Sequence, residues 1–178
     1  MKLSLFNVSL ASPVTQLFEQ VFADSEGAEE GQLIKALVAE MIETTLEQDL
    51  IGFVASTNEE MAGCIFFSRM LLASDDVAFI LSPVAIATKQ QGQGVGQKLI
   101  NYGVEQLRKL DVDLLITYGD PNFYGKVGFK QITEKQIKAP YKLSHPEGWL
   151  AQSLSNQEIP NIKGASQCVA ALNKQKYW

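Results

Sequence analysis

The chain has 178 residues and a net charge of −5, with 46% hydrophobic and 20% charged residues. This length suits one domain that buries roughly two-thirds of its unfolded surface, so we expect a single domain over residues 1–178. The negative charge argues against a nucleic-acid partner and slightly favours a cationic one. No apolar run approaches the roughly 20 residues that span a bilayer, which argues against a membrane protein.

The N-terminal residues and the cysteines bear on location and metal binding. Residues 1–6 carry one charge and a short apolar run without the longer core of a signal peptide, which predicts a cytoplasmic protein. Cys64 and Cys168 are too few for a disulfide framework and lack metal-ligand spacing. We therefore expect both thiols to be reduced and no metal to be bound. The oligomeric state stays open, a homodimer included.

The first half of the chain reads as two helices between strands. Ser12 and Pro13 suit an N-cap and a first helical position. The apolar cluster Ile65–Phe67 is expected in the core. The expected elements are a strand over residues 3–8, a helix over 13–23, a turn over 24–27, a helix over 29–48, and a hairpin over 51–70 with its turn at 57–60.

An apolar strand over residues 77–86 contains Pro83. Proline cannot donate a ladder hydrogen bond and is found in sheets mainly at bulges and edges. Apolar residues lie on both sides of Pro83, which favours a bulge in an interior strand over an ordinary edge strand. The sequence predicts a kink in this strand.

A glycine-rich turn follows, with the sequence Gln91-Gly92-Gln93-Gly94-Val95-Gly96. Alternate glycines before an amphipathic helix leave backbone N–H groups bare at its N-terminus, where the macrodipole favours an anion. A Walker loop is excluded because Gly96 is followed by Gln97, Lys98 and Leu99. A dinucleotide fingerprint counted from Gly92 requires glycine where Gln97 stands. We interpret the turn as a diphosphate cradle.

The segments after the turn have clear local signals. A helix to about residue 110 carries one apolar stripe, and Asp120 and Pro121 suit the N-cap and first residue of a short helix that Gly128 ends. Further expected elements are strands over residues 112–118, from 129, over 149–154 and over 165–171, with a loop over 139–148.

Two motifs in this order resemble the GNAT superfamily of N-acetyltransferases. Gln91, Gly94 and Gly96 fit the pattern Q/R-x-x-G-x-G/A, and Phe123–Phe129 resembles the F-Y-x-K-x-G-F segment of that family. Residues 81–86, Leu-Ser-Pro-Val-Ala-Ile, with Gly-Asp-Pro at 119–121 further resemble a bacterial subgroup of predicted acetyltransferases called YhbS-like. The resemblance covers about residues 50–133.

The resemblance implies an α/β (α+β) fold with a central mixed, mostly antiparallel sheet that is splayed between strands 4 and 5 and flanked by helices. It implies acetyl-CoA as co-substrate, a primary amine of a small molecule or protein as acceptor, and Tyr124 as general acid. The backbone of the kinked strand would pair with pantetheine, and the turn would hold the diphosphate. The implied cofactor-binding residues are Val84, Ala85, Ile86, Gln91, Gly92, Gln93, Gly94, Val95, Gly96 and Phe123.

The residues leave several questions open. Glu40, Asp75, Asp76 and Asp120 are conceivable general bases, although capping or surface roles are favoured for all four. Glu29, Glu30 and Glu40 would attract a cationic acceptor or form a solvated helix face. His145 lies among turn residues and is expected to be solvated. A coenzyme A or acyl-CoA sensor without catalysis is the alternative function, and another phosphorylated ligand is a third.

Overall fold

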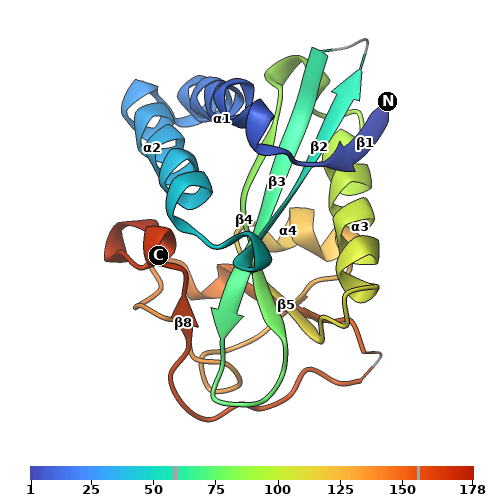
Figure 1. Ribbon diagram of the computed structural model, residues 1–178. Helices are drawn as coiled ribbons and strands as arrows, with labels where there is room; N and C mark the ends of the chain where they lie inside the picture. Colours follow the sequence, from blue (N-terminus) through green and yellow to red (C-terminus); the bar gives the residue numbers. More distant parts are fainter. Residues whose placement is uncertain (58–59, 156) are drawn as a thin grey trace. The chain divides into compact units, whose positions relative to one another are not determined.

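The computed structural model describes residues 1–57, 60–155 and 157–178 (Figure 1). The predicted hairpin turn falls partly on residues 58 and 59, which lie outside the described residues. The strands are β1 (Lys2–Leu5), β2 (Leu50–Thr57), β3 (Glu60–Leu71), β4 (Ala78–Ile86), β5 (Leu114–Tyr118), β6 (Lys130–Gln131), β7 (Trp149–Ser153) and β8 (Gln167–Cys168). The helices are α1 (Ala11–Glu26), α2 (Ala28–Thr44), α3 (Val95–Arg108) and α4 (Pro121–Tyr124).

The described strands form one eight-stranded sheet in the order β1-β2-β3-β4-β5-β7-β6, with β8 paired to β3. β4 and β5 run parallel, in a register from Ala78 with Leu114 to Leu81 with Thr117. The pairs β1 with β2, β5 with β7, β6 with β7, and β3 with β8 are antiparallel. The predicted mixed, mostly antiparallel sheet with flanking helices is therefore confirmed.

The chain divides into two compact units. The first comprises Met1–Phe67 and Pro83–Gly103, and the second comprises Ser68–Ser82 and Val104–Trp178. β3, β4 and α3 each contribute residues to both units. The glycine turn thus belongs to the first unit and Tyr124 to the second. The expectation of a single domain over residues 1–178 stays a prediction.

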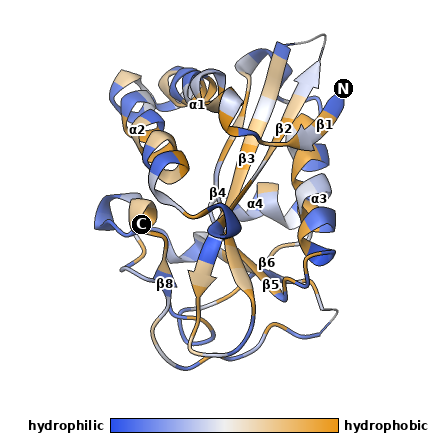
Figure 2. Cartoon of the chain, viewed as in Figure 1, coloured by the Kyte–Doolittle hydropathy of each residue, from blue (hydrophilic) through white to orange (hydrophobic). Residues whose placement is uncertain are grey.

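The core of the first unit is built around two adjacent phenylalanines of β3. Phe66 and Phe67 point to opposite faces because successive side chains of a strand alternate. The Phe66 ring contacts Phe6 and Phe18, with ring centroids 5.1 and 6.1 Å away, and the Phe67 ring contacts Phe53 at 6.1 Å. Figure 2 shows the hydrophobic residues along β3. The prediction that Ile65–Phe67 lies in the core is confirmed, since all three residues are 0% exposed.

The predicted start of the first helix is wrong. α1 begins at Ala11, so Pro13 is its third residue, and Ser12 is not its cap. The side chain of Asn7 instead accepts a hydrogen bond from the Ser9 N–H and caps a 3-10 turn before α1. The predicted turn over residues 24–27 shrinks to Gly27, whose φ of 103° ends α1. The second helix ends at Thr44 rather than near residue 48.

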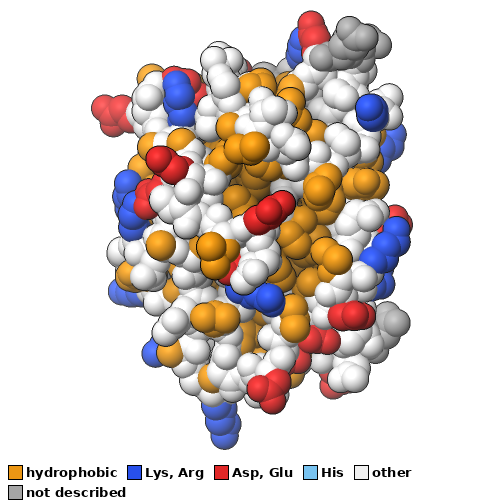
Figure 3. Space-filling model, in the orientation of Figure 1, with side chains coloured by type: hydrophobic (Ala, Val, Ile, Leu, Met, Phe, Trp, Pro, Cys, Tyr) orange, Lys and Arg blue, Asp and Glu red, His pale blue; other side chains and the backbone are white. Residues whose placement is uncertain are grey.

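The second unit has a tryptophan at its centre. Trp149 opens β7, is 0% exposed, and donates its indole N–H to the Ile137 carbonyl at 2.8 Å. The strand predicted over residues 149–154 is confirmed as β7, whereas the strand predicted over 165–171 is reduced to Gln167–Cys168. Hydrophobic side chains are also visible on the surface of the molecule (Figure 3).

Candidate functional site

The glycine turn has the backbone conformation that its sequence predicts. Gly92 and Gly94 have φ values of 72° and 75°, in the left-handed region that favours glycine. No atom lies within 4 Å of a Cβ built on either residue, so dihedral preference rather than crowding requires glycine here. Gly96 lies in the first turn of α3, and Val95 is buried at the start of that helix.

The backbone N–H groups of residues 92–97 have no backbone carbonyl acceptor among the described residues and can bind a ligand. The first hydrogen bond that leads into α3 runs from the Lys98 N–H to the Gly94 carbonyl at 3.1 Å. The N–H groups of residues 92–97 precede this bond and have no such acceptor within the described part of the chain. Helix N-termini leave such donors unsatisfied, and they carry the positive end of the macrodipole. This geometry suits an anion with several oxygens.

Three side chains hold the turn in place. Gln91 donates its amide to the Ile86 carbonyl at 3.0 Å, and Gln93 donates its amide to the Lys89 carbonyl at 3.0 Å. Thr88, the first residue of the 3-10 turn Thr88–Gln90, donates its hydroxyl to Asp24 at 2.6 Å. The Gln91 N–H is occupied by the Thr88 carbonyl, 3.3 Å away. Gln91 and Gln93 therefore shape the turn through their side chains.

The end of β4 leads directly into this turn. Val84 and Ile86 are half-buried, and Ala85 and Pro83 are buried. The Ala87 N–H donates to the Ala62 carbonyl at 2.9 Å, which ties the strand end to β3. The predicted pantetheine-pairing segment and the predicted diphosphate turn thus lie in consecutive residues of one unit.

Tyr124 ends α4, in the second unit. The predicted cap is confirmed, because the Asp120 carboxylate accepts from the Asn122 N–H at 2.9 Å. The predicted stop, Gly128, ends the 3-10 turn Gly125–Val127 that follows α4, with a φ of 94°. The Tyr124 ring packs edge-on against Phe123 and Phe129, at centroid distances of 5.1 and 5.8 Å.

Gly119 allows this packing. A Cβ on Gly119 would lie 2.6 Å from Cε2 of Tyr124, so only glycine leaves room for the ring. Sequence reasoning missed this role, although the signal was available in the position of a glycine at the end of a strand, one residue before the cap of α4.

The Tyr124 hydroxyl stays protonated across the physiological range. Burial raises the pKa of Tyr124 to about 12, the Thr117 hydroxyl acts in the opposite direction, and the charge of Asp120 adds to the rise. The residue as a whole is half-buried, while its hydroxyl end lies inside the protein. The group is therefore a hydrogen-bond donor rather than an anion at neutral pH.

The candidate general bases are largely engaged in local structure. Asp76 accepts from the Ser74 hydroxyl at 2.6 Å, and Asp120 caps α4. His145 is exposed beside Glu147, with Nδ1 3.5 Å from a carboxylate oxygen. Among the described residues, no group of three or more His, Cys, Asp or Glu side chains could hold a metal ion.

The two cysteines are free, and Cys64 is buried whereas Cys168 is half-buried. Burial raises the pKa of the Cys64 thiol far above its usual range, and burial raises the pKa of Cys168 to about 11. In the described ranges, no helix has the length and apolar character needed to cross a membrane. A cytoplasmic location stays a prediction.

The middle of the chain is similar to a known protein family. Residues 48–131 match the model of the acetyltransferase (GNAT) domain. The chain is 27% identical to the uncharacterized N-acetyltransferase YjhQ of Escherichia coli K12 over 164 residues, which are 89% of this chain and 86% of the relative. It is 27% identical to the uncharacterized N-acetyltransferase YhbS of the same strain over 90 residues, 49% of this chain and about half (54%) of that relative.

Solved structures agree on the fold. The crystal structure of Escherichia coli YhbS in complex with CoA has a TM-score of 0.80 at 20% identity, covering 97% of this chain and 92% of that one. A GNAT-family acetyltransferase from Brucella melitensis in complex with acetyl-CoA has a TM-score of 0.69 at 24% identity, covering 96% and 98%. The resemblance to the GNAT superfamily of N-acetyltransferases, and to YhbS within it, is therefore confirmed.

Proposed function

We propose that this chain is an N-acetyltransferase that transfers the acetyl group of acetyl-CoA to a primary amine. The match to the GNAT domain and the N-acetyltransferase relatives support acetyl transfer as the general chemistry. Two of the similar structures were determined with CoA or acetyl-CoA, which supports that cofactor for this chain. The acceptor, a small molecule or a protein amine, belongs to the proposal.

The unpaired N–H groups of residues 92–97 are the observation that carries this proposal. A diphosphate presents several anionic oxygens at the spacing of successive backbone donors, and glycines permit its close approach. The N–H groups of Gly92 to Gly96 would hold the diphosphate. The backbone of Val84, Ala85 and Ile86 would pair with the pantetheine amides as an added strand, and Phe123 would pack against the cofactor.

The reaction needs a base for the acceptor amine, a hydrogen-bond donor for the developing oxyanion, and a group that assists the leaving thiolate. The acceptor nitrogen attacks the thioester carbonyl and forms the C–N bond of a tetrahedral oxyanion, whose collapse breaks the C–S bond. The nitrogen gives up one proton to a base or a water chain, and the thiolate takes up one proton. A backbone N–H of the kinked strand would donate to the developing oxyanion, a contribution worth roughly 3 kcal/mol per donor in other enzymes. A lysine-like amine has a free pKa of about 10.4, so at neutral pH it must lose a proton before it attacks.

We propose that Tyr124 assists the leaving sulfur from its protonated hydroxyl. Its pKa of about 12 keeps the hydroxyl protonated at the pH of catalysis. A thiol has a pKa of about 8.5, so full proton transfer from this hydroxyl is uphill, and the group acts mainly by hydrogen bonding to sulfur as charge develops.

The proposal is tested by titrating acetyl-CoA into the chain and its Gly94→Ala variant in a calorimeter. Alanine at a φ of 75° strains the backbone by about 1–2 kcal/mol but meets no neighbouring atom, so the turn must rearrange and scatter its donors. We expect a dissociation constant at least about tenfold higher.

Gly27→Ala is the matched control. Gly27 also has a positive φ, 103°, and open space at its Cβ, but it lies between α1 and α2. This variant should lose stability and keep its affinity. No heat from the unmodified chain with acetyl-CoA, or tighter binding of ATP or NAD, would contradict the proposal.

A coenzyme A or acyl-CoA sensor without catalysis is the second candidate function. The engagement of Asp76 and Asp120 in local hydrogen bonds favours it, because a transferase needs a base or a water chain that deprotonates the amine. Acetyl-CoA that binds but releases no free thiol with any of a panel of amines would decide for the sensor.

A further inference from the structure

Thr88 connects the glycine turn, the proposed cofactor-binding segment, to α1. Its hydroxyl donates to Oδ2 of Asp24 at 2.6 Å, and Asp24 lies in α1, 64 positions earlier in the sequence. The Thr88 carbonyl in turn accepts from the Gln91 N–H at 3.3 Å. Both ends of Thr88 are therefore fixed, one to α1 and the other to the first residue of the glycine turn. All these residues belong to the first unit.

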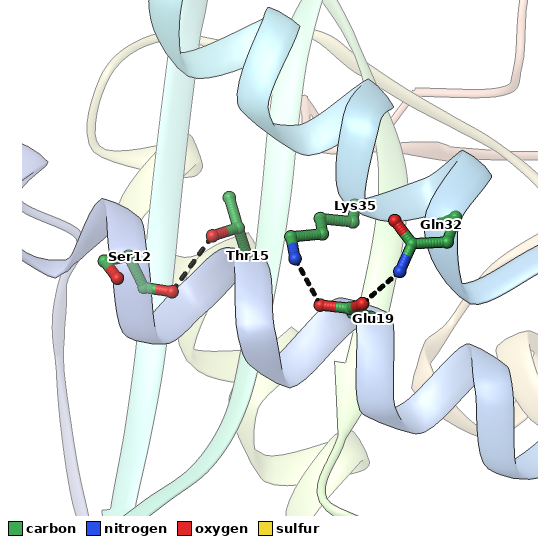
Figure 4. Close-up of polar contacts among 5 residues, drawn as sticks. All are labelled: Ser12, Thr15, Glu19, Gln32 and Lys35. Atoms are coloured by element: carbon green, nitrogen blue, oxygen red, sulfur yellow. Dashed lines mark hydrogen bonds and ion pairs between the residues drawn. The ribbon is translucent and has the colours of Figure 1, made fainter. Parts of the chain in front are cut away.

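Asp24 is itself held in place. Its Oδ1 accepts from the Gln20 amide at 2.6 Å, so both carboxylate oxygens are used. Glu19, adjacent to Gln20, accepts from Gln32 and Lys35 of α2 (Figure 4). Separate polar contacts thus join α2 to α1 at Glu19 and α1 to the 3-10 turn at Asp24.

We propose that Asp24 is a positioning residue for the glycine turn and acts through Thr88. This inference rests on the proposed function. A carboxylate offers only acceptors and repels phosphate, so Asp24 cannot itself be a ligand of the diphosphate. Glycine-rich turns lose much conformational entropy when they become ordered. The charge-assisted hydrogen bond from Thr88 to Asp24 fixes Thr88, whose carbonyl in turn holds Gln91, the first residue of the turn. Less entropy is then lost when the cofactor binds. The bond makes the turn ready for the cofactor.

The test compares Thr88→Val with Thr88→Ser. Valine keeps the shape and removes the hydroxyl, whereas serine keeps the hydroxyl. We expect Thr88→Val to raise the dissociation constant and the KM for acetyl-CoA by about three- to tenfold, with the rate at saturating acetyl-CoA within about twofold of the original. Thr88→Ser should restore the affinity. An unchanged affinity in Thr88→Val overturns the inference.

A double-mutant cycle separates positioning from charge. Asp24→Asn removes a negative charge, which favours phosphate binding, and also a strong acceptor for Thr88, which disfavours it. The effect of this single substitution on affinity therefore combines two opposite contributions. If Asp24 acts through Thr88, Asp24→Asn should weaken binding in the original chain but not in the Thr88→Val background. Equal effects in both backgrounds overturn the inference.

Two further variants serve as controls. Glu19→Gln weakens the contact between α1 and α2 without touching Thr88, and Thr15→Val removes a threonine hydroxyl of α1 that donates to the Ser12 carbonyl at 2.9 Å. Both should keep the affinity for acetyl-CoA within about twofold of the original. If the unmodified chain binds acetyl-CoA but Thr88→Val binds equally well, this inference fails alone. If the unmodified chain binds none, the proposed function fails with it.

Discussion

Tyr124 is half-buried as a residue, and its hydroxyl lies inside the protein. The ring is held by Phe123, Phe129 and the space left by Gly119, which fixes where the oxygen lies within its unit. Because burial raises its pKa to about 12, the phenol is a weaker acid than in solution and a more reliable donor. Its contribution to catalysis should therefore come from hydrogen bonding to the leaving sulfur.

Tyr124→Phe should lower the rate of thiol release at saturating substrates by about 10- to 100-fold. This is at or below the lower end of the roughly 10²–10⁴-fold that is typical of such donors, because the pKa lies far above the operating pH. Tyr124 remains protonated up to about pH 11. Any change of rate between pH 6 and 10 must then have another origin, so both proteins should show the same pH profile shape.

Tyr141→Phe is the control for this substitution, since the Tyr141 hydroxyl donates only to the Asn173 carbonyl, at 3.0 Å. It should lose one exposed hydrogen bond and keep its rate. A Tyr124→Phe variant with an unchanged rate would remove this tyrosine from the mechanism.

The packing of α3 on β3 depends on one helical glycine. A Cβ on Gly103 would lie 2.6 Å from Cε2 of Phe67 and 3.1 Å from Cδ2 of Phe53, both of which are buried. The predicted apolar stripe of this helix is buried as well, at Val95, Leu99, Ile100, Val104 and Leu107. The helix that presents the free N–H groups is therefore held against the sheet by close contact.

Gly103→Ala should lower the free energy of unfolding by about 1–3 kcal/mol, because the added methyl group forces the Phe67 ring away in a closely packed core. Denaturant unfolding followed by circular dichroism measures this loss. Gly125→Ala is the control, since Gly125 has a φ of −58° and open space at its Cβ. Equal stability of both variants would show that α3 adjusts without strain.

The sequence predicted some elements better than others for physical reasons. α4 was predicted from its cap, proline and terminal glycine because these signals act within a few residues. α1 was misplaced because Ser12 and Pro13 suit several positions of a first helical turn, and a cap at Asn7 took precedence. The contact of Thr88 with Asp24 could not be predicted, because no local pattern links residues 64 positions apart.

Charge is unevenly distributed along the chain. Residues 8–50 contain nine acidic residues and one basic residue, so they carry more negative charge than the whole chain, whose net charge is −5. This range includes α1 and α2, and with them Glu29, Glu30 and Glu40, which the sequence predicts to attract a cationic acceptor or to form a solvated helix face. A field of this sign raises the local concentration of cations and is screened by salt over about 10 Å at 0.1 M.

For an acceptor diamine, kcat/KM should therefore fall several-fold between about 0.02 and 0.5 M salt, and less for a monoamine, because each additional positive charge adds to the attraction. Steady-state rates at low acceptor concentration measure this. A double variant Glu43→Gln, Glu47→Gln should reduce the salt dependence. A diamine with salt-independent kcat/KM would exclude steering by this segment.

The raised pKa values of both cysteine thiols affect how the proposed acetyl transfer can be assayed. Reagents that report newly liberated coenzyme A react with thiolates. Cys64 and Cys168 carry almost no thiolate at pH 8, because burial raises the pKa of each thiol. Background colour from the protein should be negligible while it remains folded. A sudden increase in colour on warming would then report unfolding in the same cuvette that follows turnover.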